Sequence, residues 1–101
     1  MKKTLLIAFA FLGISSLAHA QNTILEARNM PAGSVVTVKG IVTNGAEFGV
    51  IRYFQDNTAG IAAYGSATSV ANRGDSVLVT GTLKVYNQLL EIDPVSSFTV
   101  L

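Results

Sequence analysis

The sequence predicts an all-β fold in which five short strands close into a small barrel. Apolar and polar residues alternate with a period of two along several runs, as they do in half-buried strands. Clusters of Gly, Asn and Asp separate these runs and indicate turns. Two of the runs, "VTVKGIV" and "VLVTGTL", carry a glycine in matching positions, Gly40 and Gly81. A strand glycine permits the bulge or sharp bend that a small barrel requires; the alternative is that the two glycines are a coincidence.

Residues 1–20 have the pattern of a secretory signal peptide. Lys2 and Lys3 precede an apolar run, and Ala-His-Ala follows it, ending at Ala20. This pattern predicts cleavage after Ala20, a secreted or periplasmic protein, and a single domain over 21–101 with no membrane span. The alternative is a retained anchor helix, but a membrane span requires about 20 apolar residues and this run is shorter.

Cleavage would change the chemistry that the chain can offer. His19 is the only histidine and leaves with the signal, and the chain contains no cysteine. Removing Lys2 and Lys3 from the seven basic residues leaves five against six acidic residues, a net charge of −1. The domain must therefore be stabilised by core packing without disulfides, and its net charge gives no argument for nucleic acid.

The first elements follow from local signals. A short helical turn is expected over 23–28, because Thr23 and Glu26 have the spacing of a capping box. The first strand is expected over 36–43. Asn44-Gly45 then signals a turn into the second strand.

The other strands are separated by short connections. The second, third, fourth and fifth strands are expected at 48–55, 61–65, 75–86 and 89–92. A short helix should lie between the third and fourth strands, with Val70 as its main apolar contact. Pro94 should end the fifth strand, because proline cannot donate to a strand ladder; a final edge strand over 97–101 is left open.

Five strands in this order, with a short helix after the third, describe the OB-fold, a five-stranded Greek-key barrel. The alternation also predicts which side chains point inward. The expected core consists of Val38, Val42, Phe54, Ile61, Val77, Val79, Leu83 and Ile92.

Several segments in this order resemble a known family. "TILEARNMPAGSVVTVKGIVTN", "YFQDNTAGIAAYG", "GDSVLVTGTL" and "YNQLLEI" are similar to a secreted bacterial OB-fold domain, the N-terminal module of exported multidomain proteins such as extracellular endonucleases or phosphoesterases. The resemblance covers 23–101 and implies a fused or partner nuclease or phosphoesterase domain. A more distant resemblance is to the periplasmic bacterial OB-fold proteins. The relatives usually have Asn-Gly after Tyr86; Gln88 tolerates positive φ poorly, so a different loop is expected here.

The sequence offers little for catalysis, and we expect a protein that is not an enzyme. No histidine base remains, and no nucleophile elbow, phosphate-binding loop or metal-spaced Cys/His set is present. No cofactor or metal is therefore expected. Asp56 and Asp75 are at turn starts, where backbone capping explains them. Glu91 and Asp93 share a strand face, where they could bind a cation weakly or form a solvated strand end.

Binding is easier to predict. OB-folds bind oligonucleotides or oligosaccharides on the face of strands 2 and 3, and single-strand binding uses aromatic platforms and basic residues. The candidates are Tyr53, Tyr64, Tyr86, Lys39, Arg52 and Lys84. Each tyrosine could instead cover the barrel rim and form a hydrogen bond through its hydroxyl. Alternation turns Arg52 inward unless a bulge at the barrel end frees it.

Two classes of function remain. The first is a module that binds single-stranded nucleic acid weakly and positions it for a fused or partner hydrolase. The second is an exported interaction or scaffold module for protein or glycan, with no nucleic-acid role. The net charge favours the second class and the resemblance favours the first. A reading frame that continues past Leu101 into a nuclease would favour the first.

The signal-peptide pattern predicts that the exported protein begins at Gln21. N-terminal sequencing of exported material measures this directly. An intact Met1 in a membrane fraction would contradict the prediction and indicate a retained anchor.

Overall fold

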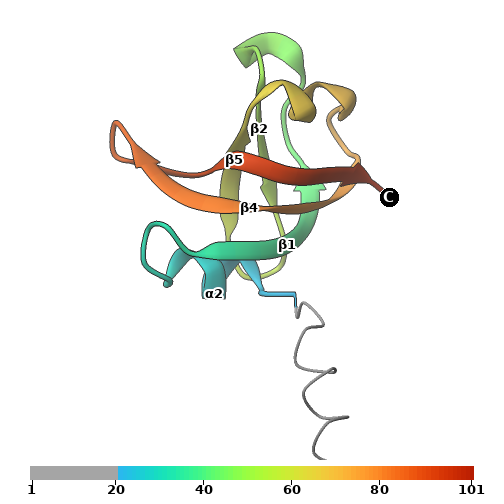
Figure 1. The fold of residues 1–101 in the computed structure, drawn as a ribbon. Helices are drawn as coiled ribbons and strands as arrows, with labels where there is room; N and C mark the ends of the chain where they lie inside the picture. Colours follow the sequence, from blue (N-terminus) through green and yellow to red (C-terminus); the bar gives the residue numbers. More distant parts are fainter. Residues whose placement is uncertain (1–20) are drawn as a thin grey trace, which may run out of the picture.

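The structure is a computed structural model that describes residues 21–101. The predicted signal peptide and its cleavage site lie outside these residues. Within them, five strands form a closed barrel in the order β1-β2-β3-β5-β4 (Figure 1). The strands are β1 (Val35–Val42), β2 (Ile51–Gln55), β3 (Gly60–Tyr64), β4 (Ser76–Tyr86) and β5 (Leu89–Val100). All neighbours are antiparallel except β3 and β5, which are parallel. The predicted all-β OB-fold is confirmed.

The helix α2 (Ile24–Arg28) packs against one end of the barrel. The predicted capping box is present, since the Thr23 hydroxyl accepts from the Glu26 amide at 3.1 Å and the Glu26 carboxylate accepts from the Thr23 amide at 2.8 Å. Ile24 and Ala27 are fully buried against the core. No helix in residues 21–101 is long and apolar enough to cross a membrane.

The phase of the strands agrees with the predicted alternation. All eight side chains that were expected in the core are buried, and Phe54 is the largest of them. The same cluster contains further buried residues on the same strand faces, on α2 and directly after the 3₁₀ segment Ser66–Val70 along the chain, namely Val36, Ala63, Ile24, Ala27 and Ala71. One contiguous core therefore fills the barrel.

Gly40 and Gly81 lie where two backbones approach closely. A Cβ at Gly81 would collide with the Ile92 side chain and would lie 2.6 Å from the Pro94 carbonyl oxygen. The β4–β5 register shifts on both sides of Gly81. A Cβ at Gly40 would lie 2.7 Å from the Gln55 carbonyl oxygen. The expected bulge is thus confirmed at Gly81, and steric space explains both glycines.

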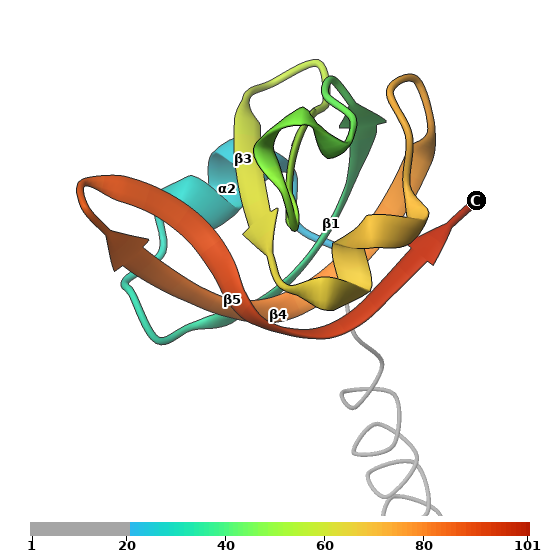
Figure 2. The same cartoon turned by 90° about the horizontal axis from the view of Figure 1, so that it is seen from above.

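The fifth strand is longer than expected, because it continues through Pro94 to Val100. Gly81 pairs with Val95 and Leu83 pairs with Ile92, so Pro94 lies in the irregular part of the ladder. A proline at a bulge removes no regular ladder hydrogen bond. Figure 2 shows β4 and β5 curving together along the barrel as one long hairpin.

The connection between β1 and β2 is also longer than a tight turn. A 3₁₀ segment, η1 (Ala46–Phe48), includes the first residue of the expected second strand, and β2 begins only at Ile51. The Asn44 side chain is buried, accepts from the Tyr53 amide at 2.7 Å and donates to the Ile51 carbonyl at 3.0 Å. Asn44 therefore acts as a hydrogen-bonding partner for the end of β2 and not as a hairpin turn residue.

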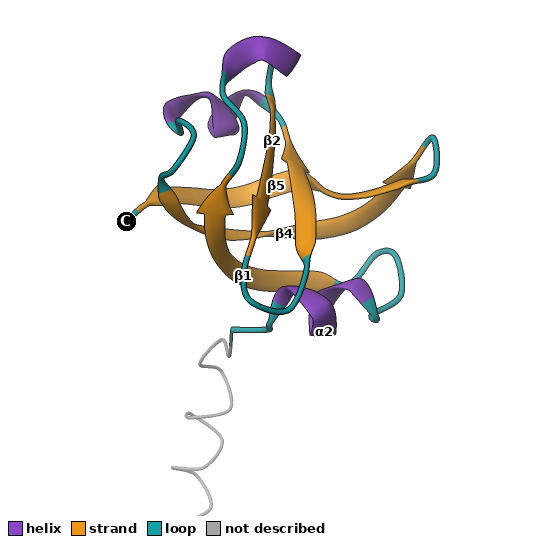
Figure 3. Cartoon of the chain, turned by 180° about the vertical axis from the view of Figure 1, so that it is seen from behind, coloured by secondary structure: helices purple, strands orange, loops and turns teal. Residues whose placement is uncertain are grey.

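Two further expectations about connections are wrong. The short helix expected between β3 and β4 is present as the 3₁₀ helix η2 (Ser66–Val70), but Val70 is exposed and is not its main apolar contact, whereas Thr68 is buried. The Thr68 hydroxyl donates to the Val50 and Gly65 carbonyls at 2.9 Å. Figure 3 shows the helical segment η2 at the end of the barrel opposite α2. The β4–β5 hairpin keeps a two-residue turn, since Asn87 and Gln88 both have positive φ (49° and 70°).

Val79→Asp tests the strand phase. An unpaired charge in the core costs several kcal/mol, so this variant should lose cooperative unfolding. Gly81→Val should also be strongly destabilising, because the added side chain has no space. Thr99→Asp, at an exposed position of β5, is the matched control and should unfold like the parent in urea. A Val79→Asp variant with the parent's unfolding midpoint would contradict the assigned phase.

Asp56 connects the β2–β3 turn to α2. One carboxylate oxygen accepts from the Ile24 amide at 2.9 Å, and the other accepts from Thr58 and from the Ala59 amide. Partial burial tends to raise the pKa of Asp56, but these hydrogen bonds outweigh it and lower the pKa from 3.8 to about 2. The predicted turn-capping role of Asp56 is confirmed, as it is for Asp75, which accepts from the Asn72 amide.

Because the folded-state pKa of Asp56 is lowered, its contribution to stability is present above pH 4 and is lost as the pH falls from about 4 to about 2. Asp56→Asn should lower the thermal midpoint at pH 7 and flatten its pH dependence in this window. Asp75→Asn is the control, because Asp75 caps its turn through a single side-chain hydrogen bond. Unchanged acid dependence in Asp56→Asn would contradict this role.

Candidate binding face

Four of the six candidate residues lie on one outer wall of the barrel. Tyr53 of β2 pairs with Ala62 of β3, Ala62 pairs with Glu91 of β5, and Glu91 pairs with Lys84 of β4. One row across four strands therefore contains Tyr53, Ala62, Glu91 and Lys84. With their neighbours they make what we call the tyrosine face, which consists of Tyr53, Ala62, Tyr64, Lys84, Tyr86, Glu91 and Asp93.

The three tyrosines are available to a ligand. Tyr53, Tyr64 and Tyr86 are 36%, 46% and 57% exposed. Phe48 of η1 contacts Tyr53 in a T-shaped arrangement, with ring centroids 6.2 Å apart and planes at 88°. Such edge-to-face contacts stabilise an aromatic side chain beyond simple burial. Tyr53 is thus a supported ring with part of its surface open.

A cavity of about 230 Å³ opens on the tyrosine face. We call it the carboxylate pocket; it is lined by Tyr64, Lys84, Tyr86, Glu91 and Asp93. The Lys84 ammonium lies 3.4 Å from a carboxylate oxygen of Asp93 and 5.9 Å from the centre of the Tyr86 ring. The pocket therefore combines two carboxylates, two aromatic rings and one cation of the chain itself.

Glu91 lies at the base of this pocket and is only 3% exposed. Burial raises its pKa, the nearby Asp93 carboxylate raises it further, and Lys84 opposes the change. The prediction that Glu91 and Asp93 share a strand face is confirmed, since both line one pocket. The alternative of a solvated strand end is wrong for Glu91, because it is only 3% exposed and lies between its neighbours Ala62 of β3 and Lys84 of β4.

Arg52 does not lie on the tyrosine face. It is 2% exposed, and its guanidinium donates to the carbonyls of Ala71, Gly49 and Ile51 at 2.9, 2.8 and 3.0 Å. Alternation along β2 turns it inward, and no bulge releases it. The expectation that Arg52 meets a ligand is corrected: its side chain closes the barrel end opposite α2.

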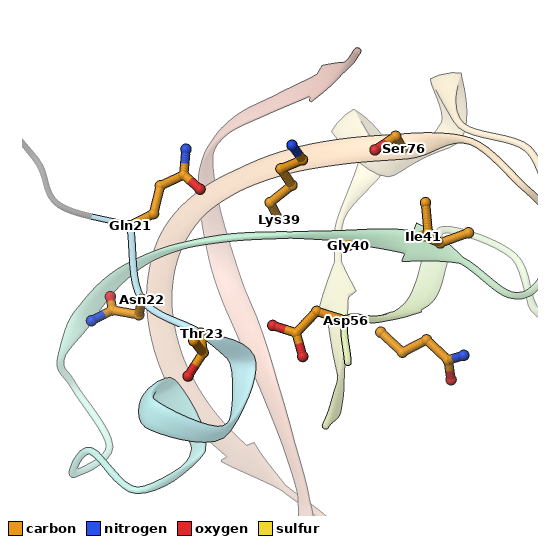
Figure 4. Close-up of a pocket in the computed structure, with 9 residues that line it drawn as sticks. Gln21, Asn22, Thr23, Lys39, Gly40, Ile41, Asp56 and Ser76 are labelled. Carbon is orange, nitrogen blue, oxygen red and sulfur yellow. The ribbon is translucent and has the colours of Figure 1, made fainter. Parts of the chain in front are cut away.

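Lys39 is exposed but lies on another wall. It belongs to β1, whose neighbours in the barrel are β2 and β4. β1 therefore does not pair with β3 or β5. Figure 4 shows it beside a cavity of about 370 Å³ between β1, the N-terminal segment and the β2–β3 turn. Asp56, which also lines this cavity, is already hydrogen-bonded to Ile24.

The basic side chains form no continuous track among residues 21–101. Arg73 is paired with Glu47, Arg28 donates to the Gly60 carbonyl at 3.0 Å, and Lys84 is paired with Asp93. In the same part of the chain, no three His, Cys, Asp or Glu side chains come together in a way that could hold a metal ion.

The sequence reasoning considered Glu91 only as half of a weak cation site with Asp93, and it included neither Glu91 nor Phe48 among the candidate ligand-binding residues. A signal for Glu91 was present: a two-residue turn at Asn87-Gln88 fixes the register that pairs Lys84 with Glu91. Expecting a different loop there removed this information. Nothing in the sequence indicated that Phe48 contacts Tyr53, because Phe48 was expected at the start of the second strand.

No protein-family model and no curated protein sequence matches this chain. Among solved structures, the chain is similar to the hypothetical protein YgiW from E. coli, with a TM-score of 0.67 and 19% sequence identity. The similarity covers 81% of this chain and 90% of the YgiW chain. At this identity it shows a shared fold, which supports the expected resemblance to bacterial OB-fold proteins. The resemblance to a module of extracellular endonucleases stays a prediction.

Proposed function

We propose that the domain is a non-catalytic binding module, exported by its signal peptide, whose ligand lies across the tyrosine face. One observation carries this proposal: three tyrosines from three different strands are exposed on a single wall that also contains a pocket. OB-folds bind ligands on the face that contains strands 2 and 3, and the tyrosine face includes both strands.

Single-stranded nucleic acid is the first candidate ligand. Bases stack on exposed aromatic rings with little dependence on sequence, and Tyr53 is the best supported of these rings. The resemblance to modules of nucleases also supports this candidate, since such a module would position a strand for a fused or partner hydrolase. The attraction to phosphates would be small, because Lys84 is the only basic residue of the tyrosine face.

A protein or glycan ligand is the second candidate, and the charge distribution favours it. Glu91 and Asp93 lie on the tyrosine face beside the tyrosines. Carboxylates repel the phosphates of a nucleic acid, whereas they accept hydrogen bonds from hydroxyl or ammonium groups. A neutral or cationic ligand therefore fits this face better than a polyanion does.

Fluorescence anisotropy of a labelled single-stranded 12-mer tests the first candidate. We expect affinity that is micromolar at best and falls with salt. Stacking is worth about 1–3 kcal/mol per base, so Tyr53→Ala should weaken binding roughly 5- to 150-fold, while Tyr53→Phe should retain most of it. Lys84→Ala should reduce the slope of log K against log salt by about 0.7, the value for one phosphate contact.

Lys39→Ala is the matched control, because Lys39 is an exposed lysine on a different wall, and it should leave the salt slope unchanged. Absence of binding even at low salt would reject nucleic acid and leave the protein or glycan class. Binding that is insensitive to Tyr53, Tyr64 and Tyr86 alike would contradict the proposed face.

A further inference from the structure

The base of the carboxylate pocket lacks a partner of opposite charge. Glu91 is only 3% exposed, and the ion pairs within residues 21–101 join Arg73 to Glu47 and Lys84 to Asp93, leaving the Glu91 carboxylate without one. A buried carboxylate without a partner is costly in its charged form, and the raised pKa of Glu91 reflects this. Its side-chain oxygens are not completely sealed from the surface, and Glu91 lines the carboxylate pocket, so the small exposed part of the residue faces that pocket.

The walls of the pocket suit an organic cation. The faces of tyrosine rings attract ammonium groups within about 6 Å of the ring centre. The Lys84 ammonium already lies at 5.9 Å from Tyr86 and 3.4 Å from Asp93. This ion pair is half exposed, and exposed pairs are held by about 1 kcal/mol or less. An incoming ammonium could therefore displace Lys84 at little cost.

The size and charge of the carboxylate pocket limit which ligands it can hold. A cavity of about 230 Å³ is smaller than the roughly 300–1,000 Å³ of pockets for drug-sized molecules, and it suits a single side chain. Two carboxylates against one ammonium leave one unbalanced negative charge when Glu91 is ionised. A calcium ion requires about six to eight oxygen ligands, and the pocket offers two carboxylates.

We propose that the carboxylate pocket binds the side-chain ammonium group of a lysine in a peptide or protein partner, which makes its ion pair with Glu91 and packs its alkyl chain between Tyr64 and Tyr86. The inference rests on the proposed function, since it takes the tyrosine face as the binding surface and names the chemistry of the ligand. Lys84 then competes with the ligand for the same carboxylates.

The test is titration of the purified protein with acetyl-Gly-Lys-Gly-amide, followed by NMR amide shifts, with the norleucine counterpart as the neutral control. The lysine peptide should shift the amides around Tyr64, Tyr86 and Glu91 and bind at least about 10-fold more tightly than the norleucine peptide. Glu91→Gln preserves shape, removes the charge and should weaken binding about 10-fold. Lys84→Met should strengthen it about 3- to 10-fold, because the internal competitor is gone.

Equal binding of the lysine and norleucine peptides would overturn the inference, as would weaker binding in Lys84→Met. If Glu91→Gln does not fold, Asp93→Asn serves instead and should weaken binding about 3-fold; no change would overturn the inference. Calcium chloride at matched ionic strength should not displace the peptide, and displacement would identify a metal site instead. If the peptides fail while a nucleic acid or glycan binds in a Tyr53-dependent manner, the proposed function stands without this inference. If no ligand binds the tyrosine face, both fail.

Discussion

The close approach of β4 and β5 at Gly81 is the constraint on which the rest of this barrel depends. The Pro94 carbonyl and the Ile92 side chain occupy the space that any side chain at position 81 would require. This contact shifts the ladder register and lets both long strands curve around the core. Beyond the shift the strands pair again, and this second stretch aligns Lys84 with Glu91. The candidate site therefore lies on the stretch between this bend and the two-residue turn at Asn87-Gln88, which sets its register.

Much of the fold could be predicted from the sequence because the signals were local. Period-two alternation gave the inward phase of Val79 and Phe54, and the capping spacing gave the start of α2. The errors arose where tertiary contacts override a local preference. Pro94 is tolerated because it lies at a bulge, and Asn44 is held by the backbone of β2 instead of forming a tight turn.

The candidate site was only partly predictable, for a related reason. The three tyrosines could be proposed from residue type, and alternation correctly suggested that Arg52 turns inward. The pocket itself depends on pairing between β3 and β5, which are distant in sequence and parallel. No local pattern indicates that Ala62 lies beside Glu91, so the burial of Glu91 could not be anticipated.

The two ends of the barrel are closed by different chemistry. At one end the Arg52 guanidinium binds three carbonyls, and a guanidinium does not lose its charge in proteins. At the other end the Asp56 carboxylate holds the first amide of α2, and a carboxylate is neutralised in acid. Acid should therefore loosen this small barrel directionally: the α2 end opens first, while the end closed by Arg52 keeps its hydrogen bonds until the core itself unfolds.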